Sequence, residues 1–397
     1  MKFFTNSIAR CAARIGTLSG FERMPDVSFE TPLLLVYTKS GSVPHLTKDI
    51  FKMVTSEQQL LSVSLPSTIL MADIIKEVDT SFATFVNMKE YINFLSIQDP
   101  AYTTNSGFQQ LDSISVWSRI GRMVLTANKY MELVEAYKPD LYVALCDGDT
   151  NINSSAKRVS KAIIRSKTLL EQCLNMHLNS DTLKSKGILG PVEGGYNLQA
   201  REESIDYLKD KPLAGFVIDG LHNNGPTVQN ISSEQIKQVV HHTINLLPTD
   251  KVRVSMGCWN PVTTLDLVEL GVDVFDSSYP YVITEQSQAL TFMCDHDACE
   301  NDQYAISVAE KRYKDEFSPI CKKCKCLTCL NHTRAYLHHL HHTKEMLGSV
   351  LLMIHNIHHY LEFFTAIRHS IKNGTFNQLQ TRIRLKYATT KSECTVA

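Results

Sequence analysis

Short runs of almost continuously apolar residues constrain the fold of this chain more than any other feature of its sequence. Because apolar positions do not alternate with polar ones, such runs are typical of parallel strands that are covered on both faces. Seven of them occur, at Leu33–Tyr37, Leu61–Leu65, Leu141–Leu145, Gly187–Val192, Phe216–Ile218, Val252–Met256 and Val272–Phe275. They predict a buried parallel sheet.

Helical patterns fill the intervals between these runs. Ser154–Leu178 opens with serines that can cap a helix, and Thr264–Leu270 is followed by Gly271, which can end one. Ser232–Gln235 forms an S-x-x-Q capping box ahead of Ile236–Leu247. Strand and helix therefore alternate. Seven or eight such units without a glycine-rich dinucleotide fingerprint predict an α/β fold, a (β/α)8 TIM-type barrel.

The composition is that of an ordinary folded chain. Hydrophobic residues make up 43% and charged residues 20%, which excludes wholesale disorder. Forty basic residues against 41 acidic ones leave a net charge of −1, which excludes a polycationic coat for nucleic acid. Apolar stretches such as Val350–Ile354 and the mostly apolar Leu361–Phe364 are far shorter than the roughly 20 residues of a membrane-spanning helix, so no membrane span is predicted.

The first residues allow two interpretations. Lys2, Arg10 and Arg14 precede the first acidic residue, Glu22, as they would in an organellar transit peptide. We favour a first strand or hairpin arm over Ile8–Leu18, because this segment leads without a break into the first predicted strand of the sheet.

Cysteine and histidine are concentrated in one C-terminal region. Four of the 11 cysteines lie between Cys321 and Cys329, and nine of the 15 histidines lie between His332 and His369. In a long chain, one dense cysteine cluster is typical of a metal site in an intracellular protein rather than of a disulfide scaffold. A C-x-C-x2-C motif followed 26 residues later by a histidine suits one tetrahedral structural zinc, with the ligands Cys324, Cys326, Cys329 and His355.

Spacing alone leaves alternatives open. Cys321 heads a C-x2-C-x-C-x2-C run that would allow four thiolate ligands, and Cys294–Cys299 has ligand-like spacing within an acidic segment. The cysteines could also be reduced residues of an ordinary loop. Most remaining histidines, His338 among them, are expected at the surface or at an interface, whereas His359 lies one helical turn from His355 and could support it.

Beyond spacing, this region resembles the C-terminal zinc subdomain of tRNA-guanine transglycosylases. The resemblance is carried by the C-x-C-x2-C motif with Asn331–Leu340, Glu345–Gly348 and His355-Asn356. It implies a (β/α)8 barrel from a family that exchanges guanine for a deazaguanine base at the anticodon wobble position of tRNA. It also implies three cysteines and the histidine as zinc ligands, which selects Cys324, Cys326, Cys329 and His355 and leaves Cys321 out.

The barrel carries the same resemblance with five departures, all near the C-terminal ends of predicted strands, where barrels place their chemistry. Gly271–Asp276 matches the family's G-x-D-x-F-D, which puts Asp276 at the nucleophile position. The departures are Thr104–Gln109 for D-S-G-G-F-Q, Leu145–Gly148 for F-D-E-C, Glu193 for the base-reading glutamine, Asp219–Gly225 for G-G-L-x-x-G-E, and Pro280–Glu285 for P-T-R-x-x-R. A base pocket of the catalytic kind is therefore not expected.

These departures resemble those of the family's non-catalytic members. The resemblance implies a protein that is not itself an enzyme and that forms a heterodimer with the catalytic subunit to hold tRNA. It further implies that Asp276 is a vestigial nucleophile position, that Asn331–Asn373 makes much of the dimer contact, and that the protein is cytoplasmic, with a peripheral fraction at the mitochondrial outer membrane.

The sequence leaves two other functions open. One is an active transglycosylase that uses Asp276 as its nucleophile. The other is a zinc-containing RNA-binding scaffold, for which the best basic patch is the segment Lys157–Lys167 with Arg158, Lys161 and Arg165, although such spacing more often marks a solvated helix face.

The sequence predicts four parts: a barrel body over residues 1–292, an acidic linker over 293–318, a zinc subdomain with terminal helices that close the barrel over 319–373, and a flexible tail over 374–397. Within the third part we expect two helices, Asn331–Leu347 and Ser349–Asn373, separated at Gly348.

Overall fold

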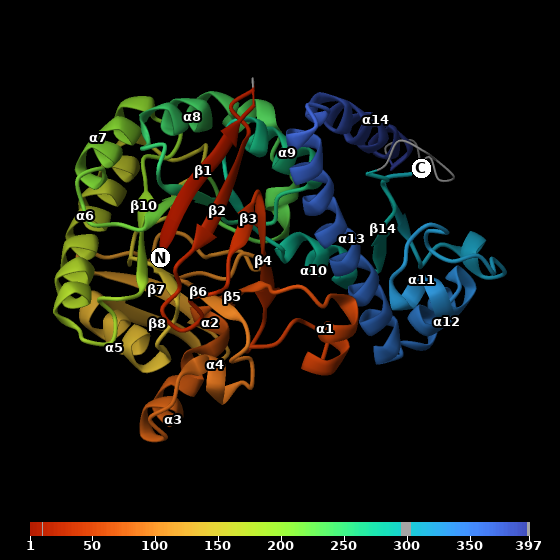
Figure 1. Ribbon diagram of the computed structural model, residues 1–397, viewed down its shortest axis with the longest axis horizontal. Helices are drawn as coiled ribbons and strands as arrows, with labels where there is room; N and C mark the ends of the chain where they lie inside the picture. The colour runs from red at the N-terminus through yellow and green to blue at the C-terminus, as the bar shows by residue number, and fades with distance from the viewer. Residues whose placement is uncertain (10, 295–302, 395–397) are drawn as a thin grey trace. The chain divides into compact units, whose positions relative to one another are not determined.

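Eight parallel strands close into a barrel in the computed structural model, which describes residues 1–9, 11–294 and 303–394 (Figure 1). Each strand pairs with the next along the chain, and the last pairs with the first. The strands are β4 (Leu33–Thr38), β5 (Leu60–Ser64), β6 (Ile92–Ser96), β9 (Leu141–Val143), β10 (Gly187–Val192), β11 (Gly215–Ile218), β12 (Val252–Ser255) and β13 (Val274–Asp276). The predicted TIM-type barrel is confirmed.

The apolar runs identify every barrel strand except β6. Its run is interrupted by Asn93, whose side-chain oxygen accepts a hydrogen bond from the backbone N–H of Asp140 at 3.1 Å. The carboxylate of Asp140 accepts in return from the Asn93 N–H at 3.0 Å. This reciprocal pair fixes the start of β6 against the start of β9, so a polar residue is needed where the pattern predicts an apolar one.

A three-stranded antiparallel sheet lies against the N-terminal end of the barrel strands. It contains β1 (Lys2–Ile8), β2 (Arg14–Ser19) and β3 (Phe29–Thr31), and this confirms the predicted hairpin arm, although Arg10 is outside the described residues. The buried Arg14 guanidinium forms two hydrogen bonds with Asp273, at 2.7 and 2.6 Å, and also binds the carbonyls of Thr249 and Lys251. All three partners precede barrel strands, so the opposite end of the barrel is left for chemistry.

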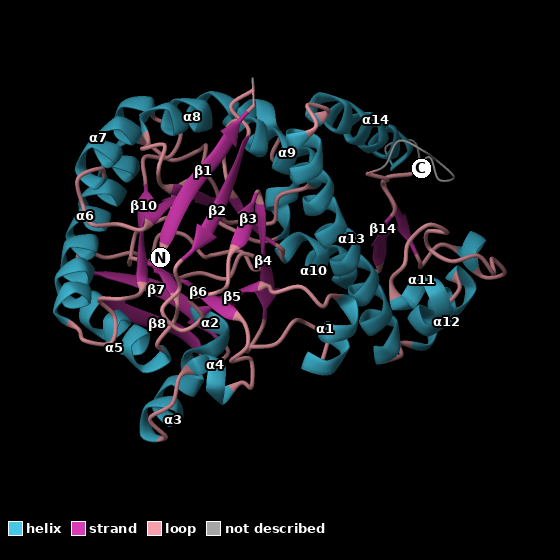
Figure 2. Ribbon diagram, viewed as in Figure 1, coloured by secondary structure: helices cyan, strands magenta, loops and turns pink. Residues whose placement is uncertain are grey.

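Helices surround the barrel strands (Figure 2). The longest helix of this unit, α6, begins after Ser155, whose hydroxyl accepts a hydrogen bond from the backbone N–H of Arg158. The predicted capping box at Ser232 and Gln235 is present at the start of α8. The helices of this unit are α2 (Leu65–Thr68), α3 (Ala72–Glu77), α4 (Phe82–Phe85), α5 (Ala127–Tyr137), α6 (Ala156–Asn179), α7 (Leu198–Leu208), α8 (Ser233–Leu246) and α9 (Pro261–Glu269), with 3-10 turns at Ile69–Met71 and Pro226–Asn230. A hairpin of β7 (Ser113–Ser118) and β8 (Gly121–Thr126) was not predicted.

The chain divides into two compact units. The barrel unit contains Met1–Gly41 and Gln58–Asp276, and the second unit contains Ser42–Glu57 and the described residues from Ser277 onward. Elements of the second unit are α1 (Lys48–Val54), α10 (Ser278–Glu285), β14 (Gln288–Leu290), β15 (Ala305–Ser307), a 3-10 turn at Lys311–Tyr313, α11 (Leu327–Asn331), α12 (Arg334–Thr343), α13 (Met346–Lys372) and α14 (Phe376–Cys394). The four-part division predicted from sequence stays a prediction.

Two expectations for the second unit differ from the structure. Gly348 does not separate the two helices, because α12 ends at Lys344 in the left-handed region and Gly348 lies in the first turn of α13. A Cβ at Gly348 would lie 3.3 Å from the Cβ of Leu340, so the glycine permits close packing of α12 on α13 rather than a break. The segment predicted as a tail forms α14, and Phe376 and Ile383 are buried along it.

The acidic linker is only partly described. Residues 295–302, which include most of the Cys294–Cys299 candidate ligand set, lie outside the described residues. After them, β15 pairs antiparallel with β14. Within the described parts of the chain, none of the helices has the length and apolar character needed to cross a membrane.

Candidate functional site

The structure brings the four zinc-ligand candidates together in the second unit. Cys324 lies just before α11, Cys326 caps its N-terminus and accepts a hydrogen bond from the Cys329 N–H at 3.4 Å, and His355 lies fully buried within α13. The Thr328 hydroxyl donates to the Leu351 carbonyl at 2.7 Å. This bond holds the cysteine-bearing segment against α13, so a local motif and a residue 26 positions later meet.

The geometry of this cluster suits a tetrahedral metal ion. The Nδ1 atom of His355 lies 3.8, 3.6 and 3.3 Å from the sulfurs of Cys324, Cys326 and Cys329. Metal–sulfur and metal–nitrogen bonds of about 2.3 and 2.0 Å, at a tetrahedral angle, place sulfur and nitrogen about 3.5 Å apart. All four ligand atoms lie within 4.8 Å of one another, so the cluster could hold a metal ion.

The imidazole of His355 is oriented by its other nitrogen. Nε2 lies 2.8 Å from the Leu290 carbonyl, to which it donates, and this leaves the Nδ1 lone pair directed at the sulfurs. The neighbouring Asn356 accepts from the Leu290 N–H at 2.9 Å and donates to Thr284 and to the Gln288 carbonyl. These bonds fix strand β14 and the histidine together before any ion enters.

The other candidates near this cluster have different partners. The sulfur of Cys321 lies 4.0 Å from the Leu290 carbonyl and is not part of the cluster. Nδ1 of His338 lies 2.8 Å from the Val308 carbonyl. His359 packs edge-on against Phe292, with ring centroids 4.5 Å apart, and burial lowers its pKa to about 3. The structure thus favours the histidine-containing ligand set over four thiolates.

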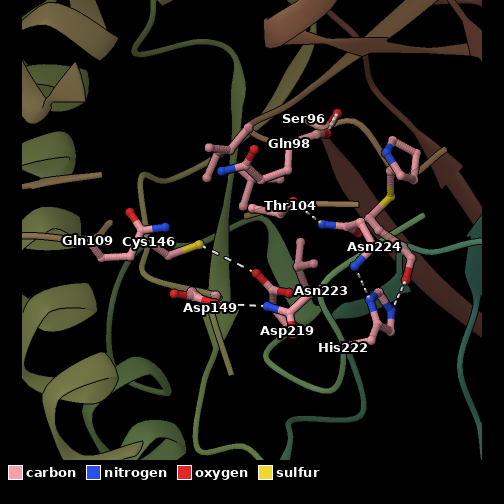
Figure 3. Close-up of a pocket in the computed structure, with 16 residues that line it drawn as sticks. Ser96, Gln98, Thr104, Gln109, Cys146, Asp149, Asp219, His222, Asn223 and Asn224 are labelled. Atoms are coloured by element: carbon pink, nitrogen blue, oxygen red, sulfur yellow. Dashed lines mark hydrogen bonds between the residues drawn. The ribbon is translucent and has the colours of Figure 1, made fainter. Parts of the chain in front are cut away.

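A second site occupies the C-terminal end of the barrel, where the sequence departs from catalytic members of the resembled family. Figure 3 shows Thr104, Asp149, Asp219, Asn223 and Asn224 around one cavity. The Asn223 side chain donates to Asp149 at 2.9 Å, and the Asn224 side chain donates to the Thr104 hydroxyl at 3.2 Å. The loops that would bind a base are therefore hydrogen-bonded to one another.

Buried acidic groups gather beside this cavity. Glu193 is fully buried, and desolvation, followed by the charge of Asp219, raises its pKa well above the ordinary value. The Cys146 thiol donates to Asp219 at 3.6 Å, and burial raises its pKa as well. The fully buried Arg201 guanidinium donates to three backbone carbonyls, of Val192, Gly195 and Asp219. From the family resemblance, glutamine and glycine are expected at these two acidic positions in catalytic members of the family.

Asp276, the position that matches the family's nucleophile, is buried at the end of β13. Its carboxylate accepts a hydrogen bond from the Gly257 N–H. Thr104, which aligns with the family's proton-transfer aspartate, presents a hydroxyl instead. The structure therefore retains one carboxylate of the expected catalytic pair and replaces the other.

The basic segment Lys157–Lys167 is not a free basic patch. Arg158 and Arg165 both bind the fully buried carboxylate of Asp147, and one Arg165 contact measures 2.9 Å. Asp147 thus points toward α6 and does not line the cavity. Of the three basic residues singled out in the sequence, only Lys161 is exposed.

Sequence reasoning missed Arg201, Asp149 and Asn223, which organise the barrel site. No motif marks them, because their partners are backbone carbonyls or residues more than 70 positions away, as in the pair of Asn223 and Asp149. Such residues could be found only once the strand ends are placed side by side.

Comparison with known proteins agrees with this picture. The sequence profile described as queuine tRNA-ribosyltransferase matches residues 10–389. A protein of Aedes aegypti named queuine tRNA-ribosyltransferase accessory subunit 2 is 40% identical over 383 residues, covering 96% of this chain and 91% of its own length. Proteins of the same name from Anopheles gambiae and Drosophila melanogaster are 39% and 35% identical, covering 96% and 100% of this chain and 90% and 95% of their own lengths.

Proposed function

The chain belongs to the queuine tRNA-ribosyltransferase family, and we propose that it is the accessory, non-catalytic subunit of that enzyme. In this role it pairs with a separate catalytic subunit and supports the exchange of guanine for queuine at the wobble position of tRNA. The proposal rests on the near full-length similarity to proteins named accessory subunit 2 and on the state of the barrel site.

The observation that carries the non-catalytic role is the combination at the barrel's C-terminal end. Asp276 keeps the nucleophile's position, but Thr104 replaces its expected acid–base partner and is hydrogen-bonded to Asn224. Loss of a general acid or base typically lowers a rate by about 10²–10⁴. The carboxylates of Glu193 and Asp219 further replace groups that would recognise a base.

We propose that Cys324, Cys326, Cys329 and His355 bind one structural zinc ion. Zinc favours a closed tetrahedral set of thiolates and imidazole when its role is structural, and the cluster is buried with its histidine already oriented. The ion would hold α11 to α13 and so stiffen the helices of residues 331–373. Through the family resemblance, we propose that these helices contact the catalytic subunit.

One exposed feature of the barrel unit supports a contact with tRNA. Phe108 is 44% exposed, its ring lies edge-on to Trp117 at 5.4 Å between centroids, and the guanidinium of Arg122 lies 5.2 Å from its centroid. An exposed ring beside an arginine suits base stacking together with phosphate contact. From the family resemblance alone, we further propose a cytoplasmic complex with a peripheral fraction at the mitochondrial outer membrane.

Reconstitution tests the proposed function. The purified chain is mixed with the catalytic subunit of the same organism, and the mass of the complex is measured together with incorporation of labelled base into tRNA. We expect one copy of each chain in the complex, activity in the mixture, and no incorporation by this chain alone. Base exchange by the isolated chain would instead support an active transglycosylase. Purification of the chain from cells without any second barrel chain bound to it would support a free-standing scaffold.

A further inference from the structure

Three potential metal ligands stand at the C-terminal ends of three adjacent barrel strands. Cys146 follows β9, Glu193 follows β10 directly, and Asp219 follows β11 directly. Since these strands are neighbours, the ends of their parallel chains bring the three side chains together, and one ligand atom of each lies within 4.8 Å of the others. Figure 3 shows the Cys146 sulfur directed at the carboxylate of Asp219.

The carboxylate of Glu193 has no standard hydrogen bond within the described residues, and Arg201, the cation that interacts with it, donates its hydrogen bonds to backbone carbonyls. The side chain is fully buried, and neither carboxylate oxygen accepts a hydrogen bond of standard geometry, although the Cys146 thiol is close enough to interact with it. A buried carboxylate without hydrogen bonds is costly and calls for a proton or a cation. A Cβ at Gly220 would lie 2.6 Å from Oε2 of Glu193, so the left-handed glycine leaves room for the carboxylate.

The charge balance of these side chains indicates what kind of ligand could complete the cluster. While the Cys146 thiol keeps its proton, Glu193 and Asp219 carry at most two negative charges against one positive charge on the adjacent Arg201 guanidinium; ionisation of the thiol on metal binding would bring the total to −2. Arg201 donates its hydrogen bonds to carbonyls and so does not satisfy the carboxylate oxygens. Asp147, the next acidic group, already binds Arg158 and Arg165. A divalent cation would neutralise the cluster.

We propose that Cys146, Glu193 and Asp219 form a second metal site, which takes a divalent transition-metal ion of the zinc class. A thiolate with two carboxylates favours zinc or cobalt over magnesium or calcium, which prefer oxygen ligands alone. Cys146 and Asp219 also line the cavity of about 60 Å³ at the barrel end, so a water molecule could complete the coordination. Binding releases the thiol proton and any carboxyl proton to solvent.

His222 is not a ligand in this arrangement. Its Nε2 lies 3.1 Å from the Met256 carbonyl, and its Nδ1 accepts from the Asn224 N–H at 3.1 Å, so both nitrogens are engaged. The proposed site is independent of the cysteine cluster in the second unit, and it goes beyond the accessory role, because neither partner nor tRNA is needed to form it.

Cobalt titration of the full-length chain that already holds one equivalent of zinc tests the proposal. We expect one further equivalent of Co²⁺ to bind, with a charge-transfer band for one thiolate. Glu193→Gln, which preserves shape, should weaken this binding about 100-fold or more, and Cys146→Ser should abolish the band. Glu203→Gln, the same change at an exposed position on α7, serves as the matched control and should bind as the wild type does.

Folding is checked by thermal denaturation without added metal, and added Zn²⁺ should raise the Tm of the wild type but not of Glu193→Gln. Failure of the wild-type chain to bind a second equivalent would overturn the proposal and leave a proton shared by the two carboxyl groups. Undiminished cobalt binding by Glu193→Gln and Cys146→Ser would overturn it as well, because the ion would then be elsewhere. Loss of tRNA modification in a reconstituted complex would not bear on this result.

Discussion

The two buried cysteine-containing clusters of this protein contrast in how their polar groups are satisfied. In the cluster of Cys324, Cys326, Cys329 and His355, the histidine is already held by the Leu290 carbonyl and all four ligands converge. In the barrel cluster, the carboxylate of Glu193 is buried without a standard hydrogen bond. The first arrangement directs all four ligand atoms at one point, whereas the second buries a carboxyl group without a standard hydrogen bond.

The contrast indicates that the two clusters are under different constraints. A structural ligand set has to be complete for its subdomain to fold, since binding free energy is folding free energy in such modules. A barrel site relieved of catalysis can exchange glutamine and glycine for acids, because the rigid barrel tolerates a local cost.

The largest effect is expected at the cysteine cluster. Cys326→Ser or His355→Ala should release zinc and unfold the residues around α11 to α13, because a structural zinc contributes about 10–16 kcal/mol in isolated modules. Metal content, measured after gel filtration, should fall by one equivalent, and association with the catalytic subunit should weaken.

Cys321→Ser is the matched control, because its sulfur lies outside the cluster. It should retain both the metal and the association. Zinc retained in His355→Ala but lost in Cys321→Ser would show that four cysteines bind the ion and that the family resemblance misplaced the fourth ligand.

The next effect concerns the charged pair beside the barrel cluster. Arg158→Ala leaves the fully buried Asp147 with Arg165 alone and should lower the free energy of unfolding by roughly 1.5–3 kcal/mol, the range for hydrogen bonds to a charged group. Lys161→Ala, on the same helix and exposed, should change it by less than about 0.5 kcal/mol. Urea denaturation measures both. Equal stability of the two variants, with weaker RNA binding in each, would restore the basic-patch interpretation of this helix.

A smaller effect of opposite sign is expected at Glu193. Burial and the charge of Asp219 raise its pKa well above 4.5, so the folded state binds the proton more tightly than the unfolded state. The stability from this group is therefore full below pH 4.5 and is lost as pH rises through the folded pKa. Without excess metal, Glu193→Gln should be more stable than the wild type at pH 7.5 by roughly 1–3 kcal/mol.

This advantage should shrink as pH falls toward 4.5 and should reverse when excess Zn²⁺ stabilises the wild type. Thermal unfolding between pH 5.5 and 8 measures it. Parallel pH profiles for wild type and Glu193→Gln would mean that the carboxyl group is satisfied in solution, and the contrast between the two clusters would fail.

The smallest effect is expected at the exposed ring of Phe108. Phe108→Ala should weaken tRNA binding by the complex about tenfold, since stacking of one base is worth about 1–3 kcal/mol. Leu70→Ala, at an exposed apolar position on the 3-10 turn before α3, is the control. Filter binding or fluorescence anisotropy at fixed salt measures both. Equal affinities would place the tRNA contact elsewhere on the chain.

The two clusters also differ in how far sequence could predict them. The spacing of Cys324, Cys326 and Cys329 is local, so the motif is visible in the sequence, and the family resemblance chose His355 over Cys321. The barrel itself is predictable because buried parallel strands are continuously apolar, except where Asn93 of β6 pairs with the backbone of Asp140.

The barrel cluster lies beyond that kind of prediction. Cys146, Glu193 and Asp219 are separated by 26 to 73 positions, and only the order of the strands makes them neighbours. Arg158 and Arg165 show a different limit, because their spacing suggests a solvated basic face, whereas the buried Asp147, in the segment that connects β9 to α6, pairs with both. The sequence pattern predicts a helix break at Gly348, whereas in the structure this glycine permits close packing against Leu340.

The most direct test of the central claim, that this chain supports catalysis without performing it, is the Asp276→Asn variant in the reconstituted heterodimer. Base exchange into tRNA is measured with the variant chain and an unaltered catalytic subunit. We predict an exchange rate equal to that of the wild-type complex, because Asp276 accepts a local hydrogen bond from Gly257 and position 104 presents a threonine hydroxyl rather than a second carboxylate. Loss of exchange, with the complex still assembled and bound to tRNA, would contradict the account and make Asp276 a working nucleophile.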